Sequence, residues 1–259
     1  MSDATGTVLD RILAETRASV ERRKRERPLS EPGEPRAPGR LRAALAAPGI
    51  GVIAEFKRRS PSAGALHDAP DLDAIVGAYA RGGAVAMSIL TEEPNFGGSL
   101  ADLGRARELT ELPLLRKDFV VDRYQLLEAR AAGADAVLLI VAALSDAELA
   151  ALSAAADELG LDVLVEVHDE GELERAAAHA PEIIGVNNRD LRDFSVDVSR
   201  TERLLEMMPP AALVVSESGI SRPEQLSALQ ASGVDAVLVG EMLMRADDPE
   251  DAIRALAAI

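Results

Sequence analysis

The sequence predicts an α/β protein with a single (β/α)8 TIM barrel and an extra N-terminal helix. Three observations lead to this prediction. The chain has 259 residues, close to the usual length of one eight-fold barrel. A helix–glycine–strand pattern recurs along it, and eight short apolar runs alternate with segments of helical length. Near-continuous apolar runs are typical of parallel strands that are covered on both faces.

The recurring pattern consists of an Ala-rich helix end, one glycine and a short strand rich in Val. It occurs at residues 80–87, 131–137 and 231–237. Its glycines are Gly83, Gly133 and Gly233, and glycine commonly ends a helix because it adopts the left-handed conformation without strain. The glycines are 50 and 100 residues apart, which are multiples of about 25 residues and fit a repeated strand–helix unit.

The eight apolar runs have the length of strands. They are residues 51–56, 84–90, 112–116, 135–142, 162–167, 183–187, 212–216 and 236–239. Helices are predicted between them, for example at 145–159 with a capping box from Ser145 and Glu148, and at 222–232 with Pro223 in the first turn. An open dinucleotide-binding sheet would show G-x-G-x-x-G after its first strand. That motif is absent after residue 56, so a closed barrel is predicted.

Residues 1–47 fall outside the repeat and are predicted to form a helical extension that packs on a barrel of residues 48–259. A helix with one apolar face should begin near Thr7. The basic cluster of residues 22–27 has two interpretations: a contact with an anionic substrate, or a solvated helix end that the helix dipole favours. The second is preferred.

Composition excludes several classes of protein. The net charge of −16 and the 2% aromatic content argue against a nucleic-acid partner. No cysteine is present, which excludes disulfides, thiolate metal sites and a cysteine nucleophile. The three histidines have no metal-binding spacing, and no apolar run is long enough to span a membrane. We therefore expect a cytoplasmic enzyme without cofactor, metal or membrane partner.

The ends of the predicted strands suggest the chemistry, because active sites of this fold lie at the C-terminal ends of the strands. The chain has 25 arginines but only three lysines, and two of the lysines, Lys57 and Lys117, end strands. An ammonium can lose its proton when burial lowers its pKa, whereas a guanidinium cannot. The alternative is a salt bridge of each lysine with Glu55 or Asp118.

Other strand ends add candidates. Glu166 ends an apolar strand and is a possible base or a partner of a lysine. Gly219 and Gly240 follow the last two strands, where such barrels often bind phosphate through backbone N–H groups. Arg189 could hold a carboxylate or phosphate, or pair with a neighbouring aspartate. His168 is interpreted as structural.

Taken together, the motifs resemble the indole-3-glycerol phosphate synthase family. The similar segments, in family order, are I-A-E-F-K-R-R-S-P-S at 53–62, F-G-G-S at 96–99, L-R-K-D-F at 115–119, L-V-E-V at 164–167, G-V-N-N-R at 185–189 and S-E-S-G-I at 216–220. The resemblance implies ring closure of 1-(2-carboxyphenylamino)-1-deoxyribulose 5-phosphate, a small phosphorylated substrate, with loss of CO₂ and water. It also implies association with other tryptophan-pathway enzymes.

The resemblance further implies roles for individual residues. Lys117 would be the general acid, Glu166 would assist proton removal, and Lys57, held by Glu55, would bind anionic or hydroxyl groups. The remaining roles would be substrate contacts by Ser60, Arg189, Asn187, Glu217 and Ser218, an aromatic-ring wall of Phe96, Phe119, Leu138 and Leu191, and backbone phosphate contacts at Gly219, Gly240 and Glu241.

Two positions depart from the family pattern: Ala63 stands where many members have Lys, and Ser216 replaces a frequent Ala. Two alternatives stay open. One is a phosphoribosylanthranilate isomerase-like sugar-phosphate isomerase, which typically uses a cysteine base that this chain lacks. The other is a non-catalytic paralogue that binds a similar ligand.

Overall fold

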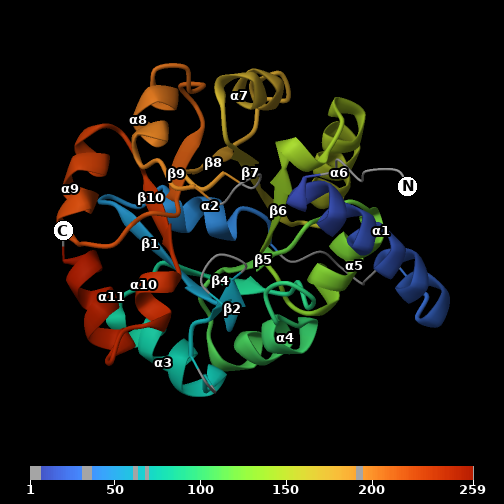
Figure 1. Ribbon diagram of the computed structural model, residues 1–259, viewed down its shortest axis with the longest axis horizontal. Helices are drawn as coiled ribbons and strands as arrows, with labels where there is room; N and C mark the ends of the chain where they lie inside the picture. The colour runs from blue at the N-terminus through green and yellow to red at the C-terminus, as the bar shows by residue number, and fades with distance from the viewer. Residues whose placement is uncertain (1–6, 31–36, 61–63, 68–69, 191–194, 259) are drawn as a thin grey trace, which may run out of the picture.

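Eight parallel strands close into a barrel in the computed structural model, which describes residues 7–30, 37–60, 64–67, 70–190 and 195–258 (Figure 1). Each strand pairs with its neighbours in the chain, and the first closes the barrel against the last. The barrel strands are β1 (Gly51–Phe56), β4 (Ala86–Leu90), β5 (Leu114–Lys117), β6 (Ala136–Ile140), β7 (Asp162–Val167), β8 (Ile183–Asn187), β9 (Leu213–Glu217) and β10 (Ala236–Val239). The predicted fold is confirmed.

Helices surround the strands on the outside of the barrel (Figure 1). They are α3 (Leu72–Gly82), α4 (Leu100–Leu109), α5 (Arg123–Ala131), α6 (Asp146–Glu158), α7 (Glu170–Ala177), α8 (Ser199–Leu205), α9 (Glu224–Ala231), α10 (Glu241–Met244) and α11 (Pro249–Ala257). Many begin at an Asp or Ser whose side chain accepts a hydrogen bond from the first helical turn, as Asp71 does in α3 and Ser99 in α4. A short hairpin, β2 (Arg59–Ser60) and β3 (Gly64–Ala65), follows β1.

The local predictions can be compared with these elements. Ser145 and Glu148 form the predicted capping box of α6. Gly83, Gly133 and Gly233 all have positive φ, which confirms the repeated glycine turn. Pro223 occupies the N-cap position of α9 rather than its first turn.

The predicted strand 135–142 is shorter in the structure. It ends at Ile140 and continues as the single turn η1 (Val141–Ala143). The guanidinium of Arg175 accounts for this end, because it donates to the carbonyl oxygens of Val141 and Leu144. The chain therefore turns where its carbonyls bind a side chain instead of a neighbouring strand.

Helix α1 (Val8–Glu26) lies against α5 on the outside of the barrel (Figure 1). It begins at Thr7, as predicted, with a capping box completed by Asp10. From its basic end, Arg23 pairs with Glu128 at 2.7 Å and Lys24 pairs with Asp122. These two cations therefore attach α1 to the barrel.

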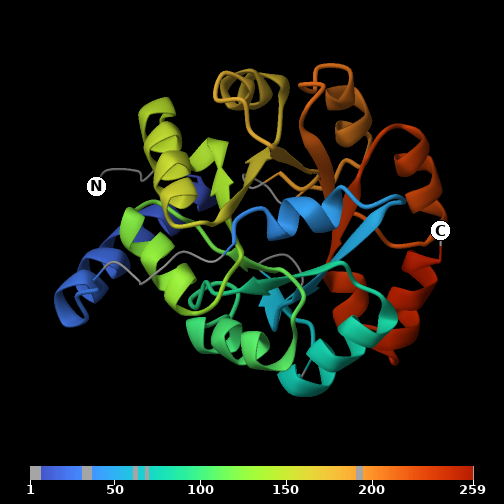
Figure 2. The same ribbon diagram turned by 180° about the vertical axis from the view of Figure 1, so that it is seen from behind.

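Helix α2 (Arg40–Leu45) crosses the end of the barrel that Figure 2 faces. The carboxylate of Asp162, at the start of β7, accepts hydrogen bonds from the backbone N–H groups of Gly39, Leu41 and Arg42. One strand-end carboxylate thus satisfies three N–H groups at the start of the helix, which have no partner within it.

Candidate active site

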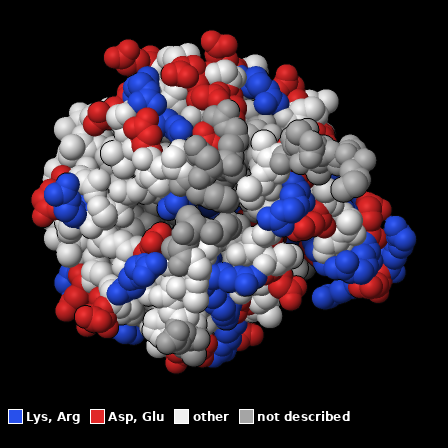
Figure 3. Space-filling model, viewed as in Figure 1, with Lys and Arg blue, Asp and Glu red and all other residues white. Residues whose placement is uncertain are grey.

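A cavity of about 510 Å³ opens at the C-terminal ends of the strands. The face seen in Figure 3 is hollowed near its centre, and atoms of Lys or Arg are visible inside the hollow. The cavity is lined by fifteen residues that the sequence singled out: Glu55, Lys57, Ser60, Phe96, Lys117, Phe119, Leu138, Glu166, Asn187, Arg189, Glu217, Ser218, Gly219, Gly240 and Glu241. Leu191 lies outside the described residues.

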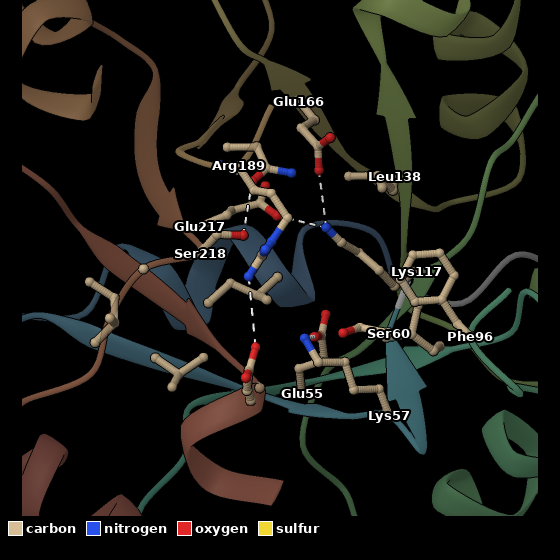
Figure 4. Close-up of a pocket in the computed structure, with 18 of the residues that line it drawn as sticks. Glu55, Lys57, Ser60, Phe96, Lys117, Leu138, Glu166, Arg189, Glu217 and Ser218 are labelled. Carbon is tan, nitrogen blue, oxygen red and sulfur yellow. Dashed lines mark hydrogen bonds and ion pairs between the residues drawn. The ribbon is translucent and has the colours of Figure 1, made fainter. Parts of the chain in front are cut away.

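Lys117 lies between two buried carboxylates at the base of the cavity (Figure 4). Its Nζ donates to Glu166 Oε2 at 3.0 Å and to Glu217 Oε2 at 2.7 Å. The three residues come from the ends of β5, β7 and β9, so alternate strands of the barrel bring them together. Such a cluster can exchange protons without rearrangement of the backbone.

The charge states in this cluster follow from burial and from the neighbouring charges. Burial alone would lower the pKa of Lys117, but the charges of Glu166, Glu217 and Glu55 outweigh it and hold that pKa above its ordinary value. Our expectation that burial lowers the pKa of a strand-end lysine is therefore wrong for Lys117. Burial raises the pKa of Glu217 to about 7, despite the opposing charge of Lys117.

Glu166 titrates in the opposite direction. Its burial favours the neutral form, but the charges of Lys117 and His168 and a hydrogen bond from Asn187 place its pKa below the ordinary value. Near neutral pH, Glu166 is therefore ionised, whereas Glu217 takes up a proton. Both carboxyl groups accept a hydrogen bond from the ammonium of Lys117. Two neighbouring groups whose pKa values lie far apart are suited to acid–base chemistry.

Lys57 forms an ion pair with Glu55, with Nζ 2.7 Å from Oε1. This is the salt bridge that the sequence left open as the alternative for the lysine, and both residues still line the cavity (Figure 4). Ser88 Oγ contacts the other oxygen of Glu55 at 3.5 Å. Gly240 leaves room for this pair, because a Cβ there would lie 3.1 Å from both Cβ and Cδ of Glu55.

The ends of β8 and β9 are joined by side-chain contacts. Asn187 Oδ1 accepts from the backbone N–H of Arg189 at 3.0 Å and from Ser218 Oγ at 2.9 Å. Ser218 has a φ of +66°, a left-handed conformation that is unusual for a residue other than glycine. Gly219 follows with a φ of +83°, so the turn after β9 depends on two left-handed residues in succession.

Glu241 faces two guanidinium groups. Its carboxylate oxygens lie 3.7 Å from Arg189 Nη2 and 3.3 Å from Arg245 Nε. The pair with Arg189 joins the end of β8 to the start of α10, and both residues line the cavity. The sequence proposed two neighbouring aspartates as partners for Arg189. Asp190 lies 3.9 Å from Arg200, and Asp193 lies outside the described residues.

The apolar wall comes from three elements. The rings of Phe96 and Phe119 are 6.4 Å apart between centroids and tilted by 43°, and Leu138 of β6 also lines the cavity. The loop with Phe96 is held by Glu92, whose carboxylate accepts hydrogen bonds from the backbone N–H groups of Asn95 and Phe96. This wall is suited to a planar aromatic ring.

The sequence assigned no role at the site to four further residues that line the cavity: Glu92, Asp118, Ser221 and Arg245. Glu92 and Asp118 follow strand ends directly, where the fold places active sites, but the sequence considered Asp118 only as a salt-bridge partner of a lysine. Arg245 lies at the end of a short helix, and no local pattern marks it.

Of the two positions that depart from the family pattern, Ser216 falls outside the cavity lining. Ser216 is fully buried, and its Oγ contacts Asn188 and Thr201 at 3.2 and 2.9 Å. Ala63 lies outside the described residues. Ser216 therefore links β9 to α8 through its hydrogen bond with Thr201.

Clusters of three or more potential metal ligands are absent from the part of the chain that the structure describes. Among the same residues, no helix combines the length and the apolar character needed to cross a membrane.

Solved structures with the same architecture include 3-hexulose-6-phosphate synthase from Salmonella typhimurium, with a TM-score of 0.66, 14% identity, and coverage of 81% of this chain and 97% of that chain. Thiamine phosphate pyrophosphorylase from Pyrococcus furiosus is similar with a TM-score of 0.60 and 19% identity, over 83% of this chain and 95% of that chain. At these identities the likeness shows the fold alone.

Relatives identified from the sequence show the family of the chain as well as its fold. Indole-3-glycerol phosphate synthase 2 of Streptomyces coelicolor is 50% identical over 253 residues, which cover 96% of this chain and 98% of the relative. Indole-3-glycerol phosphate synthase of Salinibacter ruber is 47% identical, with 97% and 96% covered. The family model of indole-3-glycerol phosphate synthase matches residues 9–256. This chain belongs to the indole-3-glycerol phosphate synthase family.

Proposed function

We propose that the cavity closes the indole ring of 1-(2-carboxyphenylamino)-1-deoxyribulose 5-phosphate with the residues described above. Membership of the family makes the chain a carbon–carbon lyase of tryptophan biosynthesis that acts on a small phosphorylated substrate. The observation that supports the residue assignment is the position of Lys117 between Glu166 and Glu217, beside an apolar wall.

Lys117 is the general acid in this proposal. The carboxylate-bearing ring carbon attacks the ketone carbon of the substrate, and Lys117 donates a proton to the oxygen that becomes a hydroxyl group. Loss of CO₂ then restores the aromatic ring. The raised pKa of Lys117 keeps it protonated before the substrate reacts.

Glu166 is the base for the dehydration. The new hydroxyl group leaves as water after it takes up a second proton, and Glu166 removes the proton from the carbon next to nitrogen. The lowered pKa of Glu166 keeps it ready to accept that proton, and Asn187 holds it through a hydrogen bond. One turnover consumes two protons and releases one, while the substrate carboxylate leaves as neutral CO₂.

The remaining groups bind the two ends of the substrate. Arg189 and Ser60, which line the cavity, would bind the carboxylate, and Lys57 with Glu55 would bind anionic or hydroxyl groups. The phosphate would bind the backbone N–H groups at Gly219, Gly240 and Glu241, at the ends of the last two strands. Phe96, Phe119 and Leu138 would enclose the aromatic ring, and Glu217 and Ser218 would contact the hydroxyl groups of the chain.

The test is turnover by the purified protein. Incubation with the carboxyphenylamino substrate should give a product with indole fluorescence, at the same rate in the presence of a metal chelator. Tight binding of the substrate without turnover would favour the non-catalytic paralogue and contradict the proposal. Isomerisation of phosphoribosylanthranilate in its place would favour the isomerase.

Three further predictions stay untested. They are the division into an extension of residues 1–47 and a barrel of residues 48–259, a cytoplasmic location, and association with other tryptophan-pathway enzymes. The ion pairs of α1 with α5 support the first, because they attach the extension to the barrel.

A further inference from the structure

We propose that His168 is a positioning residue for Glu166, and that Glu172 in turn fixes the imidazole of His168. The inference rests on the proposed role of Glu166 as a base. It concerns the side of Glu166 that faces away from the substrate, since His168 is buried and is not part of the cavity lining.

The two oxygens of Glu166 have different neighbours. Oε2 accepts the hydrogen bond from Lys117, whereas Oε1 lies 3.4 Å from Nε2 of His168. That Nε2 is fully buried and has no hydrogen-bond partner among the described residues. A buried polar nitrogen without a partner is costly. The charged group beside it is the carboxylate of Glu166, the proposed base.

The imidazole is held from its other side. Glu172 Oε2 lies 3.0 Å from Nδ1 of His168 and accepts the backbone N–H of the same residue at 2.8 Å. Glu172 is fixed in the first turn of α7, where its own N–H donates to the N-cap Asp169. One carboxylate therefore contacts two groups of His168, which sets the orientation of the ring.

The protonation state of His168 follows from this arrangement. Each ring nitrogen faces a carboxylate, and a neutral imidazole would present a lone pair to one of them. Only the imidazolium has an N–H on both nitrogens. Its positive charge next to Oε1 keeps Glu166 ionised and oriented for the proton that it takes from the substrate.

The surrounding charges agree with this state. They are Glu166 on β7, Glu172 on α7 and Glu217 on β9, with Lys117 of β5 beyond Glu166. Burial alone would lower the pKa of His168, but these carboxylates outweigh it and place that pKa above the ordinary value. His168 is in turn one of the charges that lower the pKa of Glu166.

The experiment compares His168→Gln with His179→Gln. The control histidine is exposed just after the end of the same helix, α7, so it receives the same substitution without contact to the site. Loss of the positive charge should raise the pKa of Glu166 and move the acidic limb of kcat to higher pH by about one unit. kcat at the acidic end of the profile should therefore fall about tenfold, with KM changed less than twofold, whereas His179→Gln should match the wild type.

A second variant, Glu172→Gln, keeps an acceptor for the ring but removes the charge that favours the imidazolium. It should move the acidic limb in the same direction by a smaller amount. A uniform loss of kcat at every pH, or a profile equal to the wild type, would overturn the inference. Absence of turnover in the wild type would instead contradict the proposed function, so the two failures are distinguishable.

Discussion

Lys117 Nζ is closer to Glu217 Oε2, at 2.7 Å, than to Glu166 Oε2, at 3.0 Å. Lys117, the proposed acid, is thus closest to the carboxyl group whose pKa is about 7, and its contact with Glu166, the proposed base, is the longer one. We expect protonation of Glu217 to weaken the shorter contact and to leave one hydrogen of the ammonium for the substrate oxygen.

Replacement of Lys117 by Arg separates charge from proton transfer. The guanidinium keeps a cation between the two carboxylates but does not release its proton, so kcat should fall by a factor of about 10² or more. KM should change only a few-fold. Steady-state indole fluorescence gives both constants, and Lys117→Ala provides the comparison without a cation. An Arg variant with more than a tenth of wild-type kcat would show that Lys117 acts by charge alone.

Glu217 should make stability depend on pH. Its pKa is about 7 in the folded protein against 4.5 as the ordinary value, so the folded state binds the proton more tightly. The associated stabilisation is complete below pH 4.5 and is lost as the pH rises through about 7. Glu217→Gln removes this titration.

As the pH rises from 5 to 8, the Tm of Glu217→Gln should therefore increase relative to the Tm of the wild type. A Tm difference that is the same at both ends of this range would mean that Glu217 does not take up a proton in the folded state.

Gly240→Ala should disturb the pair of Glu55 with Lys57. The new Cβ would lie 3.1 Å from Cβ and Cδ of Glu55, and the carboxylate would have to move off Lys57. We expect kcat/KM to fall at least tenfold. Gly104→Ala is the matched control, because this α4 glycine has open space around its Cβ position. The control should raise stability by about 0.5–1 kcal/mol with unchanged activity.

Asp162→Ala tests the opposite end of the barrel. It leaves three N–H groups at the start of α2 without their acceptor, at a cost of about 1–3 kcal/mol. Tm should fall by several degrees, at about 2–4 °C per kcal/mol for a protein of this size. kcat/KM should stay within twofold of the wild-type value. The control variant Asp157→Ala, at an exposed position, should change neither Tm nor kcat/KM. A large loss of activity at unchanged Tm would contradict this separation.

The fold was predictable because each barrel strand is a separate apolar run and three of the repeated units end at a glycine with positive φ. β1, β4, β6, β8 and β10 are buried at every position, so their sequences are mostly apolar and do not alternate with polar residues. The cavity lining was also predictable, since barrel closure brings all strand ends to one face whatever their distance along the chain. The roles of these residues stay predictions.

Contacts between distant side chains could not be predicted. The sequence places His168 at a strand end but cannot show that its ring lies between Glu166 and Glu172. The prediction of a lowered pKa for Lys117 was wrong for the same reason, because the sequence does not show how many carboxylates surround its ammonium. The charge state of a buried side chain depends on neighbours that are distant in the sequence. The succession of strands and helices depends on the local pattern of apolar residues.

The scarcity of lysine has a practical consequence for covalent labelling. Of the three lysine side chains, Lys57 and Lys117 line the cavity, and Lys24 is paired with Asp122 and Glu21 on the outside. A reagent selective for amines therefore meets few side chains outside the cavity. With a phosphate group to guide it, such a reagent would label Lys57 in preference to Lys117, whose raised pKa keeps its amine protonated, and protection by substrate would report occupancy of the cavity.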